Sequence, residues 1–344
     1  MNKKSLRKGI NLGGWLSQFK VYDKDHFDSF ITRDDINRLS DWGFDHIRLP
    51  IDYIVLEADS SPGIYLQPGM DYLHSCFDWC INANLRVILD LHKAPGYAFD
   101  TQEQNDFEKN IIKQQRFIDL WKILSKEFIS VSNDFLAFEL LNEIVFESSQ
   151  KWNGIVGKTL TEIRVIDRER LILFGGNYFS SVDCLHELPI DKDQNVLYKF
   201  HFYFPLSVTH QKAYWIPGLY QFGQAVNYPG RAQGLEEFIE KNPQFQLRLD
   251  EDVNVNFNFN YLKKRIMPAI EFMNRNNQPL HCGEFGVIDK APIQTRLNWI
   301  RDMVTLLREF EIGYAYWTYK EMDFGLVDSV GKIINQDLID ILVK

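Results

Sequence analysis

Eight short apolar segments, separated by stretches with helical periodicity, are the feature that most restricts the fold of this 344-residue chain. Short apolar runs bounded by polar or turn residues are typical of buried β-strands. The predicted strands are Gly9–Leu12, His46–Leu49, Val87–Leu91, Leu136–Leu141, Leu171–Gly175, Val196–Phe202, Leu280–Gly283 and Gly313–Trp317. Apolar residues three and four apart predict helices at Asp71–Ala83, Asn105–Ile129, Lys151–Ile166, Tyr261–Asn274 and Thr295–Phe310. A further helix is expected after Thr32, whose hydroxyl and the acidic residues behind it suit a helix start.

Strands that alternate with helices predict a parallel sheet, and eight such units predict a closed (β/α)₈ TIM barrel. The length suits a single catalytic domain over residues 1–344, because barrels of this type run from about 200 to over 400 residues. An open doubly wound sheet is the competing α/β fold. It usually carries a G-x-G-x-x-G phosphate loop after its first strand, and Gly9–Gly14 lacks that spacing.

One interval breaks the regular spacing of the strands. Nearly eighty residues separate Phe202 from Leu280, and the extra segment, residues 205–260, is too long for a plain loop. We predict that it forms a small subdomain inserted after the sixth strand, on the rim that carries the catalytic residues. The alternative is a surface insertion with no function.

Composition excludes several classes of partner. A net charge of −9 argues against binding to nucleic acid or to an anionic membrane. No segment approaches the roughly 18 apolar residues of a membrane-spanning helix. The basic start Met1–Lys8 leads into Gly9–Trp15 and not into the apolar core of a secretory signal. We therefore expect a monomer without a membrane partner, located in the cytoplasm, or secreted if a leader has been removed.

The cysteines do not predict a disulfide framework or a metal site. They are few and scattered, and a metal would need further ligands nearby. We expect Cys76 and Cys80, one helical turn apart, to be reduced thiols in the core, and we expect neither a metal nor another cofactor. The four are Cys76, Cys80, Cys184 and Cys282.

Polar and aromatic side chains occur where the predicted strands stop. In a parallel barrel all strands point their carboxyl ends at one face, which is where active sites lie. Taken singly, a histidine at a strand end is more often structural, and a tryptophan there more often belongs to the core. Taken together, the residues predict one site. They are Arg48, His92, Asn142, Glu143, His201, Tyr203, Glu284 and Trp317.

Two of these strand ends carry a glutamate, Glu143 and Glu284, 141 residues apart along the chain. A pair of carboxyl groups that converge on one site is what hydrolysis of a glycosidic bond requires, one as acid and the other as nucleophile or base. The abundance of aromatic residues, 14% of the chain, also suits sugar recognition.

Several motifs resemble glycoside hydrolase family 5, and the resemblance covers nearly the whole chain. The motifs are Gly43–Pro50, Leu89–His92, Phe138–Glu143, His201–Tyr203, Gly283–Gly286 and Trp317. Within that family, the chain also resembles the branch of the clostridial endoglucanases C. The segments that resemble this branch are Gly9–Gln18, Thr209–Ala213 and Tyr319–Phe324.

The resemblance implies a retaining endo-β-glucanase that cleaves internal β-1,4 and mixed-linkage β-1,3-1,4 bonds, with a mainly helical subdomain after strand six. It implies that Glu143 is the acid/base and Glu284 the nucleophile. Arg48 and Tyr203 would donate hydrogen bonds to Glu284. The remaining residues would bind the β-glucan: Asn142 at the sugar 2-hydroxyl, His92 and His201 at other hydroxyls or tuning the carboxyl groups, and Trp317 as a stacking floor.

The inserted segment leaves the barrel directly after His201 and Tyr203, so its Trp215 is placed to cover bound sugar. Lys93 departs from the pattern of the family, in which many members carry a second histidine at this position. An ammonium group would then meet the sugar there, which affects the fit of the substrate and not the chemistry.

Other activities stay open at this stage. The same residues could cleave β-1,3-glucan or β-mannan. A metal-dependent barrel isomerase or aldolase would instead use Glu143, His201 and Glu284 as ligands. A sugar-binding barrel without activity is disfavoured because both carboxyl groups and Asn142 are intact.

Overall fold

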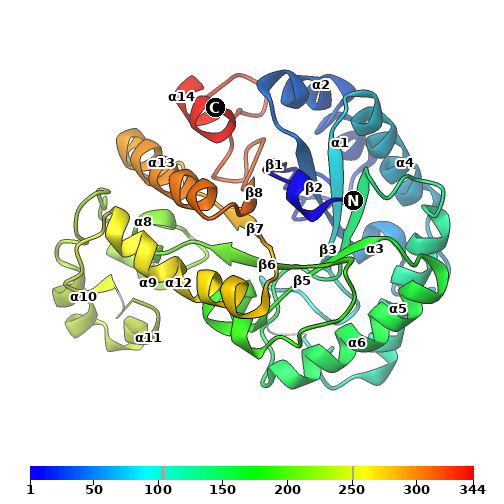
Figure 1. Cartoon of the computed structure of the whole chain (residues 1–344). Coiled ribbons are helices and arrows are strands. Elements are labelled where there is room, and N and C mark those ends of the chain that lie inside the picture. The colour runs from blue at the N-terminus through cyan, green and yellow to red at the C-terminus, as the bar shows by residue number, and fades with distance from the viewer. Residues whose placement is uncertain (102–104, 250–251) are drawn as a thin grey trace.

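The computed structural model describes residues 1–101, 105–249 and 252–344. Its centre is a closed barrel of eight parallel strands in chain order, in which β1 pairs with both β2 and β8 (Figure 1). The predicted TIM barrel and all eight predicted strands are confirmed. The strands are β1 (Lys8–Asn11), β2 (His46–Asp52), β3 (Arg86–Lys93), β4 (Leu136–Glu139), β5 (Leu171–Gly175), β6 (Val196–Phe202), β7 (Leu280–Phe285) and β8 (Gly313–Tyr316).

The ends of some strands differ from the prediction because buried side chains continue beyond the last residue of the backbone pairing. β4 ends at Glu139, two residues before the predicted end, because the chain leaves the ladder while its side chains stay buried. Asn142 still donates its backbone N–H to the carbonyl of Leu91 at 3.1 Å. Asn142 and Glu143 therefore follow the strand closely. β3 runs on to Lys93, so that His92 lies inside the strand and not behind it.

Longer helices surround the barrel, as the periodicity predicted (Figure 1). Thr32 caps α2 as expected, and it forms a reciprocal capping box with Asp35. Within the three described ranges, no helix combines the length and apolar character needed to cross a membrane. The longer helices are α2 (Arg33–Trp42), α4 (Gln67–Asn82), α5 (Ile111–Glu127), α6 (Ser149–Ile166), α12 (Phe259–Asn276), α13 (Ile293–Glu309) and α14 (Gln336–Val343). Shorter pieces are η1 (Lys3–Ser5), α1 (Lys24–Ser29), α3 (Tyr53–Leu56), α7 (Asn177–Ser180) and η2 (Val182–Glu187).

The chain between β6 and α12 forms short helices, which Figure 1 shows gathered beside α12 and away from the barrel axis. Two backbone hydrogen bonds between Gly230 and Phe257 join the middle of this segment to its end. α12 begins at Phe259, so the last residues of the predicted range 205–260 belong to that helix. Residues 250 and 251 of the range lie outside the described residues. Organisation of this segment as a separate subdomain stays a prediction. Its helices are α8 (Leu206–Thr209), α9 (Pro217–Phe222), α10 (Leu235–Lys241), η3 (Pro243–Phe245) and α11 (Gln246–Leu249).

The strands are buried on both faces, with alternate residues pointing into and out of the barrel. On β4, Phe138 points outward, where its ring packs 5.2 Å from that of Trp121 on α5. Ala137 belongs to a small apolar cluster with Ile88 and Leu197, separate from the main core under the helices. All four cysteines are buried and free, which confirms the prediction made for Cys76 and Cys80.

Candidate active site

A layer of charged side chains lies two residues beyond the inner apolar cluster on three strands. Asp90 follows Ile88 on β3, Glu139 follows Ala137 on β4, and Lys199 follows Leu197 on β6. The period of two along a strand directs each charged residue to the same side as its apolar predecessor. All three are fully buried and in contact through ion pairs with Arg48 or with each other. The barrel therefore carries charge in its upper interior, directly beneath the strand ends.

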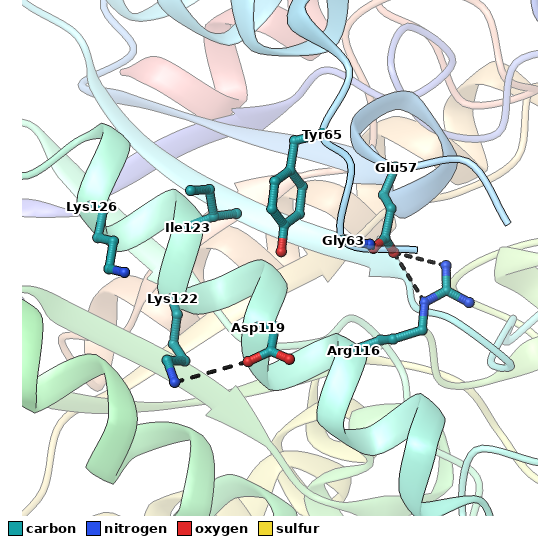
Figure 2. A pocket seen from close by; sticks show the side chains of 8 residues that line it. All are labelled: Glu57, Gly63, Tyr65, Arg116, Asp119, Lys122, Ile123 and Lys126. Carbon is teal, nitrogen blue, oxygen red and sulfur yellow. Dashed lines mark hydrogen bonds and ion pairs between the residues drawn. The ribbon is translucent and has the colours of Figure 1, made fainter. Parts of the chain in front are cut away.

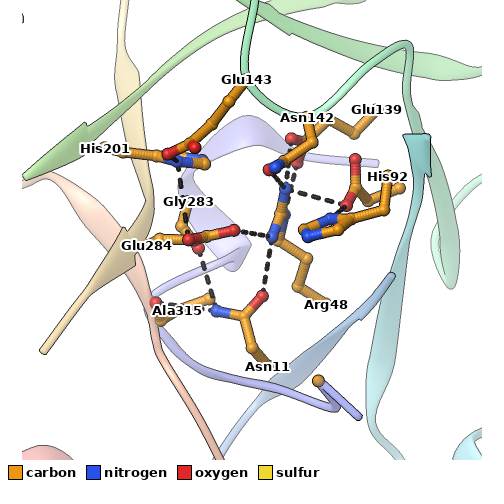
Figure 3. A network of polar contacts seen from close by, with 12 residues as sticks. Asn11, Arg48, His92, Glu139, Asn142, Glu143, His201, Gly283, Glu284 and Ala315 are labelled. Atoms are coloured by element: carbon orange, nitrogen blue, oxygen red, sulfur yellow. Dashed lines mark hydrogen bonds and ion pairs between the residues drawn. The ribbon is translucent and has the colours of Figure 1, made fainter. Parts of the chain in front are cut away.

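Arg48, on β2, is the hub of this layer (Figure 3). Its guanidinium donates to both oxygens of Glu139 at 2.7 and 2.8 Å, and Asp90 lies 2.9 Å away. Its Nη1 donates to Oε1 of Glu284 at 2.7 Å. The planar guanidinium is held by several charge-assisted hydrogen bonds at once, so its position is fixed before any ligand binds.

Asn11, on β1, supports the other side of Arg48. Its Oδ1 accepts from Arg48 Nη1 at 2.9 Å, while its amide nitrogen donates to the backbone carbonyls of Gly283 and Ala315 at 3.0 and 3.1 Å. Asn11 thus joins β1 to β7 and β8 next to the guanidinium (Figure 3).

Glu284, on β7, is held from two sides. Oε1 accepts from Arg48, and Oε2 accepts from the hydroxyl of Tyr203 at 3.0 Å. Burial, and after it the charge of Glu284, raises the pKa of Tyr203 well above its ordinary value, so the phenol keeps its proton to donate. The two predicted donors to Glu284 are thus the ones found, and they fix the direction in which its carboxylate points.

Glu143, just past β4, has different surroundings. Its Oε1 lies 2.8 Å from Nδ1 of His201, and no cation among the described residues is within ion-pair distance of its carboxyl. Burial, followed by the negative charge of Glu284, raises the pKa of Glu143 well above the usual range. The hydroxyl of Tyr97 donates to the backbone carbonyl of Glu143 at 2.6 Å and accepts from the N–H of Val145, which holds this turn.

The two predicted glutamates converge. An oxygen of Glu143, an oxygen of Glu284 and a ring nitrogen of His201 all lie within 4.8 Å of one another. His201 Nδ1 is 3.7 Å from Glu284 Oε2. These three residues could in principle hold a metal ion. Such an ion would stand beside Arg48, which is bonded to Glu284, and Lys199, whose ammonium is 3.2 Å from His201 Nε2. The repulsion from two cations disfavours that use.

Asn142 has its amide oriented by Arg48. The guanidinium can only donate, so the atom that it contacts at 2.8 Å must be the amide oxygen. The amide nitrogen then points away, and it is buried without a hydrogen-bond partner among the described residues. A buried donor without a partner is costly unless a ligand satisfies it. Asn142 therefore offers two N–H groups to whatever binds beside Glu143 and Glu284.

His92 and Trp317 form a parallel stack, with ring centroids 5.7 Å apart and planes within 7°. His92 Nδ1 is 2.5 Å from Asp90 Oδ2. Burial, and after it the charge of Arg48, lowers the pKa of His92 to about 3, so the ring is neutral. Gly13 leaves room for Trp317, because a Cβ there would come within 2.7 Å of the indole ring.

Trp215 lies at the end of a chain of aromatic contacts that leads back to the site. Its ring meets that of His210 edge-on, with centroids 6.1 Å apart, and His210 meets Tyr203 in the same way at 4.9 Å. Trp215 is 40% exposed. An exposed indole two rings away from Tyr203 is free to touch a ligand that extends out of the barrel.

Sequence reasoning missed part of the site. Asp90, Glu139 and Lys199 hold Arg48, His92 and His201 in place, but they stand inside strands that read as continuously apolar. A signal existed, since a charge in a strand that is buried on both faces must find a partner. Tyr97 and Asn11 gave no comparable signal, because tyrosine and asparagine are common in loops and at strand ends.

A hollow on the outside of the barrel lies away from this site. It measures about 340 Å³ and is lined by residues of the 57–65 segment and of α5 (Figure 2). Two of its cations are already paired, Arg116 with Glu57 at 2.7 Å and Lys122 with Glu162 at 2.8 Å. Nothing in this hollow points to a ligand.

The chain is similar to several known proteins along nearly its whole length. Endoglucanase C of Acetivibrio thermocellus is 41% identical over 340 residues, which cover 99% of this chain and 98% of that protein. Cellodextrinase A of Ruminococcus flavefaciens is 32% identical over 303 residues, 88% of this chain and 82% of that protein. Among solved structures, the cellulose synthase subunit Z of Clostridioides difficile superposes with a TM-score of 0.78 at 24% identity, over 98% of this chain and all of that one.

Cel5A of Thermotoga maritima, solved with cellobiose, shares the fold with a TM-score of 0.76 at 24% identity, over 99% of this chain and 98% of that one. The profile of the family described as Cellulase (glycosyl hydrolase family 5) matches residues 8–323. The chain therefore belongs to the cellulase family, glycosyl hydrolase family 5.

Proposed function

We propose that this chain is a retaining endo-β-glucanase that cleaves internal β-1,4 bonds of glucans, including mixed-linkage β-1,3-1,4-glucan. The observation that carries the proposal is the pair Glu143 and Glu284, with carboxyl oxygens within 4.8 Å of each other and unlike surroundings. Retaining enzymes hold their two carboxyl groups about 5 to 5.5 Å apart, whereas inverting enzymes need about 6.5 to 9.5 Å to admit a water.

In the first step, a Glu284 oxygen attacks the anomeric carbon of the sugar, and the bond from that carbon to the glycosidic oxygen breaks. Glu143 gives its proton to the departing oxygen, so the leaving sugar is released as a neutral alcohol. The product on the enzyme is a glycosyl ester of Glu284. Arg48 and Tyr203 orient the attacking carboxylate, and the raised pKa of Glu143 keeps its proton available near neutral pH.

In the second step, Glu143 is a carboxylate and acts as a base. It takes a proton from water, the water oxygen bonds to the anomeric carbon, and the ester bond to Glu284 breaks. Both groups return to their starting protonation states. Two inversions at the same carbon leave the anomeric configuration unchanged.

The surrounding residues suit a glucan chain. The free amide N–H groups of Asn142 face the space beside the two glutamates, where they can donate to the 2-hydroxyl of the reacting sugar. That contact strengthens as the transition state forms. Trp317 and His92 present a flat surface on which an apolar sugar face can stack.

The configuration of the first product is the direct test. Proton NMR during hydrolysis of a β-glucan should show the β-anomer first, and release of the α-anomer would refute retention. Product profiles on barley β-glucan, carboxymethylcellulose, laminarin and glucomannan would assign the linkage. Preferred cleavage of laminarin or glucomannan would replace the β-1,4-glucan proposal. Activity that disappears with a chelator and returns with a metal would refute the metal-free mechanism.

A further inference from the structure

Lys199 is a buried cation that the proposed reaction does not use directly. It is fully buried on β6, two residues before His201 and on the same side of the strand. Gly175 leaves room for it, because a Cβ at that position would come within 3.0 Å of the Lys199 side chain. Burial of an ammonium group is costly unless each of its N–H groups finds an acceptor.

Three acceptors surround the Lys199 ammonium, one for each of its three N–H groups. Glu139 Oε1 lies 2.8 Å away, the backbone carbonyl of Asn142 is in hydrogen-bond contact, and His201 Nε2 lies 3.2 Å away. The Glu139 acceptor is a charged carboxylate, and the backbone carbonyl of Asn142 can act only as an acceptor. The third is a ring nitrogen that can either accept or donate, depending on where the imidazole proton sits.

The geometry decides the position of that proton. An ammonium group has no lone pair, so His201 Nε2 can only accept from Lys199 and must be unprotonated. Burial, and after it the charges of Lys199 and Arg48, lowers the pKa of His201 well below its usual value, so the ring is neutral. Its one proton is then on Nδ1, which lies 2.8 Å from Glu143 Oε1 and 3.7 Å from Glu284 Oε2.

We propose that Lys199 is a positioning residue that fixes the Nδ1–H tautomer of His201 and so aims a hydrogen-bond donor at the catalytic carboxyl pair. The proposal rests on the proposed roles of Glu143 and Glu284. The same ammonium also holds the backbone carbonyl of Asn142, next to Glu143 in the chain. Lys199 therefore acts on the acid/base in two ways, through the imidazole and through the turn that carries it.

The ammonium also acts on the site through its charge. It favours the ionised forms of the acids around it and the neutral forms of the imidazoles. For Glu143 it opposes burial and the charge of Glu284, both of which hold the proton on that residue. The titratable groups around Lys199 are Asp90, Glu139, Glu143, His201, His281 and Cys282.

The tautomer can be observed in the wild-type enzyme. Long-range proton–nitrogen correlation NMR on protein with isotope-labelled histidine distinguishes the two neutral tautomers, and the His201 signal is assigned by its loss in His201→Asn. The expected result is protonation at Nδ1. Protonation at Nε2 would overturn the proposal, and this readout requires no Lys199 variant that folds.

A Lys199→Met variant tests the cause. The thioether side chain has a similar length but neither charge nor N–H. We expect the His201 ring to shift toward the Nε2–H tautomer, and the basic limb of the kcat/KM profile to move up by about one pH unit as Glu143 loses the influence of a nearby cation. An unchanged tautomer and an unmoved basic limb in a folded variant would refute the proposal.

Arg170→Met is the matched control. Arg170 is also a fully buried cation, but it lies just before β5 at the opposite end of the barrel, paired with Asp167 at 3.0 Å. The control should lower the melting temperature without moving the basic limb. An equal shift in the control would mean that Lys199→Met acts only by loosening the barrel.

A second comparison separates this proposal from the one on which it rests. If Glu143→Ala keeps the basic limb of the wild-type profile, then Glu143 is not the acid and both proposals fail. If Glu143→Ala loses the limb while Lys199→Met leaves it in place, only the role of Lys199 is wrong.

Discussion

Replacing Glu143 by alanine removes the proposed proton donor to the departing sugar. Burial, and then the charge of Glu284, raises the pKa of Glu143, so the wild-type side chain carries a proton near neutral pH. General acid–base catalysis contributes about 10²- to 10⁴-fold, which equals roughly 3 to 5 kcal/mol of activation free energy. We expect Glu143→Ala to lose turnover of natural β-glucan by a factor in that range.

An aryl cellobioside with an acidic phenol leaving group should respond differently. Its bond breaks with little protonation, so the first step on Glu143→Ala should stay fast. The glycosyl ester of Glu284 then accumulates, because no base activates water. Added azide should attack this ester and restore turnover, with a β-glycosyl azide as product. Glu284→Ala forms no ester, so it should lose turnover of both substrates, and azide should give the α-glycosyl azide.

The assay is product analysis by NMR together with turnover of both substrates, and Glu147→Ala is the control. Glu147 lies four residues beyond Glu143, in the same loop, but its side chain is 63% exposed and pairs with Lys109. Its loss should change turnover by less than about twofold, since exposed ion pairs contribute little. Equal losses of Glu143→Ala on natural and activated substrates, or the same azide anomer from both catalytic variants, would refute the assignment.

Three further predictions follow from individual side chains. Trp215→Ala should raise KM on cello-oligosaccharides, because the exposed ring covers only an extended ligand. Hydrolysis of small aryl glycosides and the melting temperature should stay nearly unchanged. Wild-type efficiency on both the oligosaccharides and the aryl glycosides would contradict this prediction. The kcat/KM profile should fall on its basic side as Glu143 loses its proton, at a pH above the ordinary range of a glutamate, and titration at about 4.5 would contradict the raised pKa. Burial, and after it the nearby His46, lowers the pKa of His281 in the folded chain, so protonation favours the unfolded chain below about pH 6.5. The melting temperature should therefore fall as the pH drops below that value, and it should fall less steeply in His281→Gln.

The barrel could be predicted from the sequence because its strongest signals are local. Eight apolar runs with helices between them leave few α/β architectures, and glutamates such as Glu284 appeared where such runs stop. The catalytic pair therefore required only the strand count and the rule that strand ends share a face. The ends themselves were less certain, as β4 shows, since side chains past Glu139 stay buried after the ladder stops.

The supporting layer could not be predicted in the same way. Parallel strands buried on both faces read as nearly continuous apolar runs, which hides the alternation that would separate inward from outward residues. Lys199 in Val196–Phe202 is one case, and its partner Glu139 comes from another strand 60 residues earlier. Such partners are set by the closure of the barrel, and hydrogen bonds as specific as that from Lys199 to His201 follow only from the assembled structure.

Charge balance in the barrel explains why the pKa of Glu143 is raised and its carboxyl group keeps a proton. Four carboxyl groups, Asp90, Glu139, Glu143 and Glu284, share the buried space with two cations, so all four cannot ionise there at low cost. Glu139 contacts both cations; although burial opposes it, their charges lower its pKa to about 2. Glu284 contacts Arg48. Among the described residues, the carboxyl group of Glu143 contacts only the neutral ring of His201, so burial leaves its proton in place. The roles proposed for the two glutamates match this difference in surroundings, because Arg48 contacts Glu284 and does not contact Glu143.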